Sequence, residues 1–417
     1  MQLKRVVVTG LGALTPLGNT LQEYWNSLIN GVSGADLITL FDATKFKTRF
    51  ACEVKHFDTA AFFDRKEARK IDRFTQFALA VAEEALNDSG IILEKEDCDR
   101  IGVIWGSGIG GLRTFQEEVL EFGRGDGTPR FNPFFIPKII SDIASGHISI
   151  KYGLRGPNFT TVSACASSTN ALIDAFNYIR LGQADVMVSG GSEASVTEAG
   201  VGGFNALQAL SLRNDDPKTA SRPFDLNRDG FVLGEGAGCI MLEELEHANA
   251  RGAKIYAEMK GGGMSADAYH ITAPHPEGLG ALNVMRAALK DAGLKTSDID
   301  YINVHGTSTP LGDVSETKAI VSVFGEDAYR FNISSTKSMT GHLLGAAGAI
   351  EAIASIMAIK NDHVPPTINH FADDPGFDPK LNFTFNKAQK RTVRNALSNT
   401  FGFGGHNASV IFGKYDS

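Results

Sequence analysis

The stretch Thr160-Thr161-Val162-Ser163-Ala164-Cys165-Ala166-Ser167-Ser168 indicates both the fold class and the chemistry of this chain. β-Branched residues at its start are typical of a strand, and the apolar periodicity from Ser167 to Arg180 predicts a helix. Cys165 therefore stands at a strand-to-helix junction, where unpaired helix N–H groups and the helix dipole favour a thiolate. The thiolate is the nucleophilic form of cysteine. The alternative is a small buried thiol that only fills space.

The composition limits the classes of function. With 417 residues, of which 43% are hydrophobic, the chain is long enough for a large core and more than one structural unit. Its 40 basic and 48 acidic residues give a net charge of −8, which argues against a general nucleic-acid-binding surface. The four cysteines form no CxxC pair, so we expect no disulfide framework, no zinc site and a reducing cytoplasm.

No secretory signal and no membrane span are expected. The N-terminal residues lack an apolar core followed by a cleavage site. The most apolar segment, Leu343 to Ile359, is interrupted by Glu351, so it predicts a buried helix.

Strand-like and helix-like segments alternate along the chain, which predicts an α/β architecture. Residues 85–91 resemble residues 288–294, and each segment precedes an acidic loop and an apolar strand. A helix after Cys165 corresponds to a small-residue helix after His342. We therefore predict two similar α/β halves, residues 1–255 and 256–417, with a turn at residues 261–263 as the seam; chance similarity is the alternative.

Two histidines follow strand-like segments at polar turns. His305 opens the turn 305–313, and His342 follows the turn 334–341, which contains Lys337. The ends of strands are where α/β proteins place their ligands. A single histidine is often structural, but two at equivalent turns, with a cysteine at a third, predict a shared site.

A fourth element is the glycine-rich segment Asn399-Thr400-Phe401-Gly402-Phe403-Gly404-Gly405-His406-Asn407. Glycines permit unusual backbone angles and close approach to a ligand. Such a segment can direct N–H groups at a developing oxyanion; the alternative is a mobile surface turn.

These four elements, in this order, resemble the β-ketoacyl-[acyl-carrier-protein] synthases of the thiolase-like superfamily, and the type II enzymes most of all. The segments 221–225, 228–236 and 364–369 also match the family, so the resemblance covers essentially the whole chain. It implies a layered αβαβα fold made of two similar halves, and a homodimer.

The resemblance also implies an activity: the decarboxylative Claisen condensation of an acyl group with malonyl-[acyl-carrier-protein] in fatty-acid elongation. Cys165 would hold the acyl group, while His305 and His342 would stabilise the enolate as neutral N–H donors. No metal and no redox cofactor are implied. The partners would be acyl- and malonyl-loaded carrier protein, with neither nucleic acid nor membrane.

Further roles follow from the family's pattern. Lys337 would bias the protonation of its neighbours, and the N–H groups of Cys165 and Phe403 would form the oxyanion hole. Gly402 and Gly404 flank this gating phenylalanine. Ile109 would line the acyl pocket, and its aliphatic bulk suggests acceptance of long chains. Supporting roles would fall to residues near the first histidine, which are Asp313, Glu316, Thr307 and Thr309.

Carrier proteins of this pathway are acidic, so docking requires basic residues. Five of them recur at helical spacing between Arg65 and Arg73, which predicts one helical face; a solvated charged surface is the alternative. The positions that match the family's docking patch are Lys66, Arg69, Lys70 and Arg130. Relatives often carry basic residues at the positions of Phe131 and Gln208, and threonine at that of His406, so the docking surface and this loop depart from the pattern.

Other readings are less consistent with the sequence. Residues 106–111 fit GxGxxG, but no acidic strand end follows at the spacing of a dinucleotide site. Residues 225–230 begin like a calcium loop, but the required glutamate position is Gly236. A degradative thiolase would need a second active cysteine near the C-terminus, whereas the last one is Cys239. A non-catalytic chain-length-determining subunit would lack Cys165.

Overall fold

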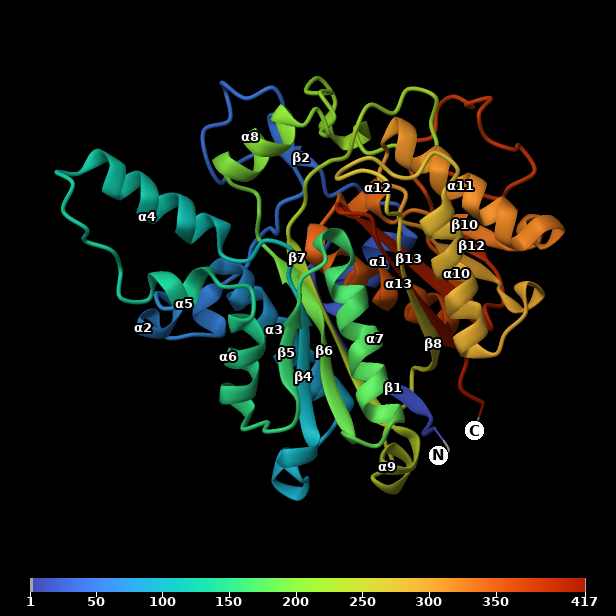
Figure 1. Ribbon diagram of the computed structural model, residues 1–417, viewed down its shortest axis with the longest axis horizontal. Coiled ribbons are helices and arrows are strands. Elements are labelled where there is room, and N and C mark those ends of the chain that lie inside the picture. The colour runs from blue at the N-terminus through green and yellow to red at the C-terminus, as the bar shows by residue number, and fades with distance from the viewer. Residues whose placement is uncertain (1–2, 417) are drawn as a thin grey trace.

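The computed structural model describes residues 3–416 and is built on a ten-stranded mixed sheet (Figure 1). The strand order is β10-β9-β13-β14-β8-β1-β7-β6-β4-β5. The strands of the first half are β1 (Val6–Leu14), β4 (Ile101–Gly106), β5 (Asn158–Thr161), β6 (Val186–Glu193) and β7 (Gly236–Glu244). Those of the second half are β8 (Ala257–Ala266), β9 (Tyr301–Asn303), β10 (Asn332–Ser334), β13 (Asn395–Gly402) and β14 (His406–Gly413).

The two halves repeat one topology. Strands β1 and β8 pair antiparallel at the centre, and outward from them the orders β1-β7-β6-β4-β5 and β8-β14-β13-β9-β10 correspond strand for strand. In each half the three outermost strands run parallel, β4 with β5 and β6, and β9 with β10 and β13. The predicted α/β class with two similar halves is therefore confirmed, while the boundary at residues 255/256 stays a prediction.

Two central helices separate the halves. Helix α7 (Ser167–Arg180), whose bounds match the predicted ones, packs on β6 and β4 and also on β14 and β8. Helix α13 (Ala347–Asn361) packs on β13 and β9, on β7, and on α7. On the outer faces lie α3 (Arg73–Ser89) against β1 and β7, and α10 (Leu279–Ala292) against β8 and β14. These contacts produce the layers α-β-α-β-α (Figure 1).

The repeated segment is a helix end. Both α3 and α10 stop at a glycine with φ of 65°, Gly90 and Gly293. Two short 3₁₀ turns and a strand follow α3, and one 3₁₀ turn and a strand follow α10. A left-handed backbone angle costs glycine no steric penalty. The sequence similarity therefore reflects the same helix stop in both halves.

The predicted turn at residues 261–263 is wrong, because these residues lie inside β8 and pair with β14. Their glycines allow close packing: a Cβ at Gly261 would lie 2.6 Å from the backbone nitrogen of Ala292, and one at Gly263 would lie 2.5 Å from the Val284 carbonyl oxygen. The side-chain-free surface lets α10 approach the strand.

The predicted single basic helix over residues 65–73 is also wrong. Asp64 caps α2 (Arg65–Ala68) and Asp72 caps α3, so two separate helices begin within this segment. Arg73 turns inward and donates to the buried carboxylate of Glu235 at 2.7 Å. It is therefore not part of an exposed basic face.

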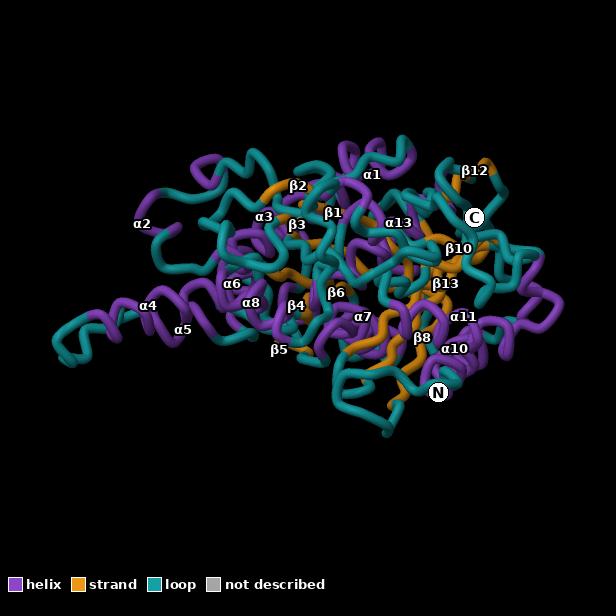
Figure 2. Tube along the Cα trace, turned by 90° about the horizontal axis from the view of Figure 1, so that it is seen from above, coloured by secondary structure: helices purple, strands orange, loops and turns teal. Residues whose placement is uncertain are grey.

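Helices α4 (Leu112–Arg124) and α5 (Phe135–Ile139) form an arm that extends away from the body of the protein (Figures 1 and 2). The remaining helices are α1 (Leu21–Ile29), α6 (Ile143–Tyr152), α8 (Glu198–Ala206), α9 (Leu245–Ala250), α11 (Pro310–Phe324) and α12 (Lys337–Thr340). Two small antiparallel sheets pair β2 (Asp36–Leu37) with β3 (Phe50–Ala51), and β11 (His363–Val364) with β12 (Gln389–Lys390).

One segment, Leu344–Asn361, is long and apolar enough to cross a membrane, but 89% of it is buried inside the protein. It contains α13, which occupies the central layer. The prediction of a buried core helix here is therefore confirmed.

Candidate active site

Cys165 lies in a 3₁₀ turn, Ala164–Ala166, that leads directly into α7. The same turn recurs in the other half, where residues Leu344–Ala346 lead into α13. The first residue of each turn has a positive φ, 51° at Ala164 and 49° at Leu344. Non-glycine residues rarely adopt this conformation, and it is enriched at functional sites. The predicted junction between strand and helix is therefore present and strained.

The structure brings the predicted cysteine and both predicted histidines together. The Nε2 atom of His342 lies 3.0 Å from Sγ of Cys165, and the ring centroids of His305 and His342 are 5.3 Å apart. His305 follows β9 as predicted, whereas the short helix α12 lies between β10 and His342, within the segment predicted as a turn. All three side chains line one cavity of about 520 Å³.

The backbone determines the tautomer of His342. The Leu344 N–H donates to Nδ1 of His342 at 3.3 Å, which leaves the ring proton on Nε2, the atom that faces Cys165. The main chain of His342 is held between the Val232 carbonyl, at 2.7 Å, and the Gly234 N–H, at 2.9 Å. His342 thus presents an oriented N–H donor to the sulfur.

The sulfur does not rest as a thiolate. Burial raises the pKa of the Cys165 thiol to about 12, although the charge of Lys337 and the Phe403 N–H act in the opposite direction. Burial thus opposes the thiolate expected at the helix terminus, because removing a charge from water is unfavourable. The resting state is a neutral thiol.

Both histidines are neutral. Burial, followed by the charge of Lys337, holds the pKa values of His305 and His342 well below the usual range. Nδ1 of His305 is buried without a hydrogen-bond partner. Neutral rings in these positions can donate N–H groups to a substrate oxygen.

The glycine-rich segment forms the hairpin between β13 and β14, with Gly404 and Gly405 at φ of 86° and 74° in its turn. A Cβ at Gly402 would lie 2.7 Å from the Ser163 carbonyl oxygen and 3.1 Å from the Cys165 nitrogen, so glycine lets the strand end approach the nucleophile closely. Phe403 lines the cavity, and its N–H group reaches Cys165. The two backbone donors predicted for an oxyanion hole are therefore neighbours.

Lys337 is buried and forms an ion pair with Glu351 of α13, the residue that interrupts the apolar segment. Glu351 was not among the predicted site residues. A single charge in a buried helix requires a buried partner of opposite sign. The glutamate within the apolar segment could therefore have predicted a pair with Lys337.

The predicted supporting residues organise the His305 turn. Glu316 accepts from the N–H groups of His305 and Gly306 at 2.9 and 2.8 Å. Asp313 accepts from the Ser308 N–H at 3.1 Å. Burial raises the pKa of Glu316 to about 7 and that of Asp313 to about 6. The hydroxyl groups of Thr307 and Thr309 lie 3.0 Å apart at the cavity wall.

Ile109 lines the same cavity from the turn after β4. The GxGxxG-like segment holds a carboxylate of the protein itself: Glu193 accepts from the N–H groups of Gly108, Ile109 and Gly110 at 2.7, 3.2 and 3.2 Å. Glu193 was not among the predicted site residues. In the calcium-like segment, Asp225 accepts from the Phe371 N–H at 2.7 Å. Residues 106–111 and 225–230 thus take part in hydrogen bonds within the protein.

The predicted docking residues lie outside the cavity. Lys66, Arg69 and Lys70 are exposed around α2, and Nζ of Lys70 lies 5.7 Å from the ring centroid of Phe134, at the base of the arm. Arg130 is exposed in the arm and pairs with Asp126 at 3.2 Å. The structure therefore does not gather the four into one cluster through direct contacts.

The residues that depart from the family's pattern lie in three places. Phe131 stacks between Phe122 and Phe135 on the arm. Gln208 lines the cavity, and His406 is exposed beside Gly404.

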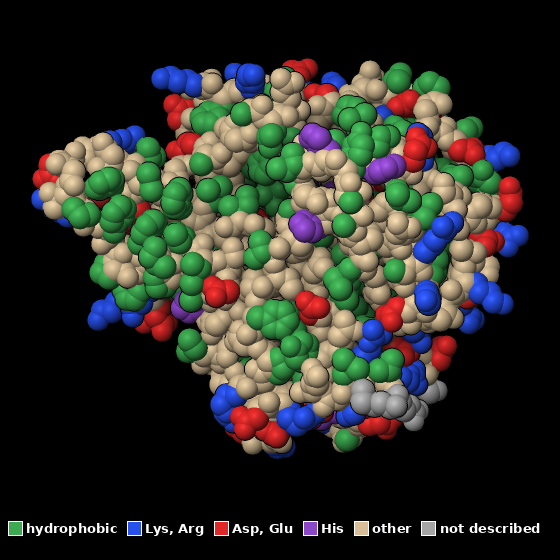
Figure 3. All heavy atoms as spheres, viewed as in Figure 1, with side chains coloured by type: hydrophobic (Ala, Val, Ile, Leu, Met, Phe, Trp, Pro, Cys, Tyr) green, Lys and Arg blue, Asp and Glu red, His purple; other side chains and the backbone are tan. Residues whose placement is uncertain are grey.

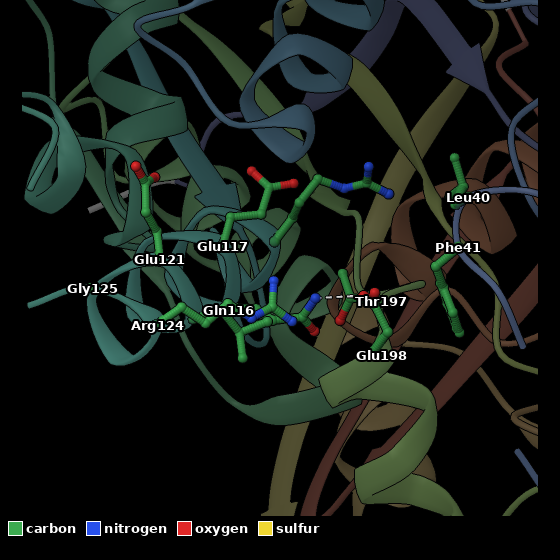
Figure 4. Close-up of a pocket in the computed structure, with 11 residues that line it drawn as sticks. Leu40, Phe41, Gln116, Glu117, Glu121, Arg124, Gly125, Thr197 and Glu198 are labelled. Atoms are coloured by element: carbon green, nitrogen blue, oxygen red, sulfur yellow. Dashed lines mark hydrogen bonds between the residues drawn. The ribbon is translucent and has the colours of Figure 1, made fainter. Parts of the chain in front are cut away.

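A separate cavity of about 470 Å³ lies between α4 and the start of α8 (Figure 4). Gln116 and Glu198 are hydrogen-bonded within it, and the Ala199 N–H donates to Gln116 at 2.7 Å. None of the predicted site residues lines this cavity.

Two family models match this chain: "Beta-ketoacyl synthase, N-terminal domain" over residues 3–248 and "Beta-ketoacyl synthase, C-terminal domain" over residues 256–371. Among curated proteins, 3-oxoacyl-[acyl-carrier-protein] synthase 2 of Synechocystis sp. is 52% identical over 418 residues, which cover 100% of this chain and 99% of that protein. The protein of the same name from Staphylococcus aureus strain COL is 49% identical over 419 residues and 100% of both chains.

Solved structures agree with these sequence matches. A beta-ketoacyl synthase from Burkholderia phymatum STM815 has a TM-score of 0.91 at 36% identity, covering 99% of this chain and 100% of that one. A type II PKS acyl-carrier protein in complex with its ketosynthase bound to the hexaketide has a TM-score of 0.88 at 34% identity, with 100% of both chains covered. The ishigamide ketosynthase/chain length factor reaches 0.92 at 36% identity, covering 99% of this chain and 100% of that one.

Proposed function

The chain belongs to the beta-ketoacyl synthase family, and from this premise we propose that Cys165, His305 and His342 carry out its condensation chemistry. The activity is that of a 3-oxoacyl-[acyl-carrier-protein] synthase in fatty-acid elongation: an acyl group is joined to malonyl-[acyl-carrier-protein], and carbon dioxide is released. The observation that carries the assignment of residues is the contact of 3.0 Å between Cys165 and His342 in a shared cavity.

In the first step, Cys165 Sγ attacks the carbonyl carbon of an acyl thioester. The thiol proton passes to the leaving carrier-protein thiolate, so an acyl-cysteine and a free carrier thiol result. The N–H groups of Cys165 and Phe403 face the developing oxyanion. Because the thiolate is the attacking form, the Cys165 thiol must lose its proton as the S–C bond forms.

In the second step, the malonyl thioester loses carbon dioxide, and its electron pair becomes an enolate. The Nε2–H of His342 and an N–H of His305 donate to the thioester oxygen that takes up the charge. The enolate carbon then attacks the acyl-cysteine and displaces the Cys165 thiolate, which takes up a proton. The charge of Lys337, which is paired with Glu351, helps to hold both histidines neutral.

The two rival functions fit less well. A thiolase needs a second reactive cysteine, but Cys239 is fully buried within β7 and does not line the cavity. A chain-length-determining subunit needs no nucleophile, whereas Cys165 is present with both histidines in place.

One assay tests the proposal. Intact-protein mass spectrometry after incubation with acyl-[acyl-carrier-protein] should reveal an acyl adduct on Cys165, and malonyl-[acyl-carrier-protein] should then discharge it as 3-oxoacyl product. A ladder of acyl chains from short to long would define the preferred substrate. An adduct on any other residue, or no discharge, would contradict the assignment.

We also propose that carrier protein docks on the basic residues Lys66, Arg69, Lys70 and Arg130. Opposite charges steer association, and salt screens this attraction. The KM for acyl-carrier protein should rise with ionic strength, whereas the KM for an uncharged acyl thioester mimic should not. Equal salt dependence for both substrates would place docking elsewhere.

A homodimer is the third part of the proposal. Apolar side chains gather over the arm (Figure 3), and each is at least 40% exposed: Phe115, Val119, Leu120, Phe122, Phe134, Ile136 and Ile140. Strand β5 is the edge of the sheet, and Val162 beside it is 60% exposed. An open sheet edge and an exposed apolar patch each favour a partner, so Ile136→Asp should yield monomers in sedimentation.

The cytoplasm is the proposed location. All four cysteines are free, and three of them are buried, which suits a reducing compartment.

A further inference from the structure

Glu193, the last residue of β6, is fully buried and bridges two separate turns. Oε2 accepts from the Gly108 N–H at 2.7 Å and from the Gly345 N–H at 3.2 Å. Oε1 accepts from the N–H groups of Ile109 and Gly110, both at 3.2 Å. No Lys or Arg nitrogen lies within 4 Å of this carboxylate in residues 3–416. The carboxylate is thus held by four backbone donors and, more weakly, by the Ser107 hydroxyl at 3.4 Å from Oε1.

Each of the two turns lines the catalytic cavity. The turn after β4 contributes Gly108 and Ile109, while the turn before α13 contributes Leu344 and follows His342. The first belongs to one half of the fold and the second to the other. Glu193 therefore joins the wall that carries Ile109 to the segment that carries a site histidine.

The glycines show how tightly this junction is built. A Cβ at Gly345 would lie 2.2 Å from the Gly108 nitrogen, and a Cβ at Gly108 would lie 2.9 Å from Oε2 of Glu193. The two backbones are therefore in contact, with the carboxylate beside them. A displacement of the Ile109 turn cannot occur without breaking hydrogen bonds to this carboxylate.

The four N–H donors favour the carboxylate form of Glu193, while burial raises its pKa to about 7. Both oxygens accept at once, each from two N–H groups, which a carboxylate satisfies with its lone pairs. A glutamine would turn an N–H₂ group toward two N–H donors and leave them unpaired. An aspartate keeps the charge but is shorter by one methylene, so it cannot reach both turns.

We propose that Glu193 is a positioning residue that sets the place of Ile109 relative to Cys165 and thereby the length of acyl chain that Cys165 accepts. This inference rests on the proposed function, since it concerns the acyl group held on Cys165. Glu193 acts through the Ile109 turn and does not touch the reacting atoms.

The test compares initial rates of Cys165 acylation by long-chain and short-chain acyl-carrier protein, followed by intact-protein mass spectrometry. In E193Q and E193D, the ratio of the two rates should change by about tenfold, the scale on which a pocket discriminates chain length. The matched control is E84Q, because Glu84 also accepts two backbone N–H groups, from Ala13 and Leu21, each at 2.8 Å, and does not line the cavity. Its ratio should match that of the unmodified chain.

A double-mutant cycle separates positioning from general stability. The double variant of Ile109→Ala and E193Q should show the same ratio of long-chain to short-chain acylation rates as Ile109→Ala alone. The inference would be overturned if both Glu193 variants kept the ratio of the unmodified chain, or if both lost the fold. It would also be overturned if the changes in ratio caused by E193Q and by Ile109→Ala multiplied in the double variant. Absence of acylation in the unmodified chain would instead refute the proposed function.

Discussion

The Nε2 atom of His342 lies 3.0 Å from the Sγ atom of Cys165, although 177 residues separate them along the chain. Each residue stands beside the entry to a central helix, α7 in one half and α13 in the other. Because these helices pack on each other, the pseudo-symmetry of the fold places the nucleophile against the N–H donor.

Replacement of the nucleophile separates chemistry from folding. Cys165→Ala should abolish the acyl adduct in intact-protein mass spectrometry, since alanine cannot form a thioester. The melting temperature should change little, because the site loses only one sulfur atom. Cys239→Ala, a second buried cysteine, should keep the adduct. An adduct that survives in Cys165→Ala would remove this residue from the mechanism.

The histidines should matter for the second half-reaction. His305→Ala and His342→Ala should still form the acyl-enzyme but lower the rate of condensation by about 10²–10³, the loss typical of one oxyanion donor. Stopped assays with malonyl-[acyl-carrier-protein] measure this rate. His363→Ala, a histidine of β11 that does not line the cavity, is the control and should retain the full rate. Normal condensation in either site variant would show that its ring does not stabilise the enolate.

The buried pair of Lys337 and Glu351 should be strongly coupled, since both side chains are no more than 1% exposed. Lys337→Met leaves Glu351 buried without a partner, and should lower the free energy of unfolding by about 3–5 kcal/mol. The double variant with Glu351→Leu should recover most of this loss, because it removes both charges together. Urea unfolding measures the effect. If the double variant lost as much free energy of unfolding as the two single variants together, the pairing would be contradicted.

A pH dependence of stability follows from His247. Glu243 contacts Nδ1 of His247 and Glu96 contacts Nε2, and together they raise the pKa of His247 above its ordinary value of 6.5. Arg251 also pairs with the Glu243 carboxylate. The protonated ring therefore stabilises the folded state fully below pH 6.5 and loses this contribution as pH rises through the raised pKa. The difference in melting temperature between the unmodified chain and His247→Gln should shrink as pH increases across this window. A constant difference would exclude the titration.

Much of this fold was predictable because its signals are local. The apolar periodicity of residues 167–180 predicted α7 at its observed bounds, and the repeated helix stop at Gly90 and Gly293 predicted two similar halves. Predictions from glycine and charge patterns were wrong where tertiary packing determines the structure. Residues 261–263 look like a turn but belong to a strand, and Arg73 looks like a surface charge but pairs with the buried Glu235.

By itself the sequence determined the two α/β halves, the junctions that bear Cys165, His305 and His342, and the family. Backbone preference, periodicity and motif order are properties of neighbouring residues, so they can be read along the chain. Only the tertiary structure decided that Lys337 meets Glu351, that Glu193 joins the Gly108 and Gly345 turns, and that burial keeps the Cys165 thiol protonated. Those relationships depend on how two distant halves pack together and exclude water, and no local pattern encodes the distances that result.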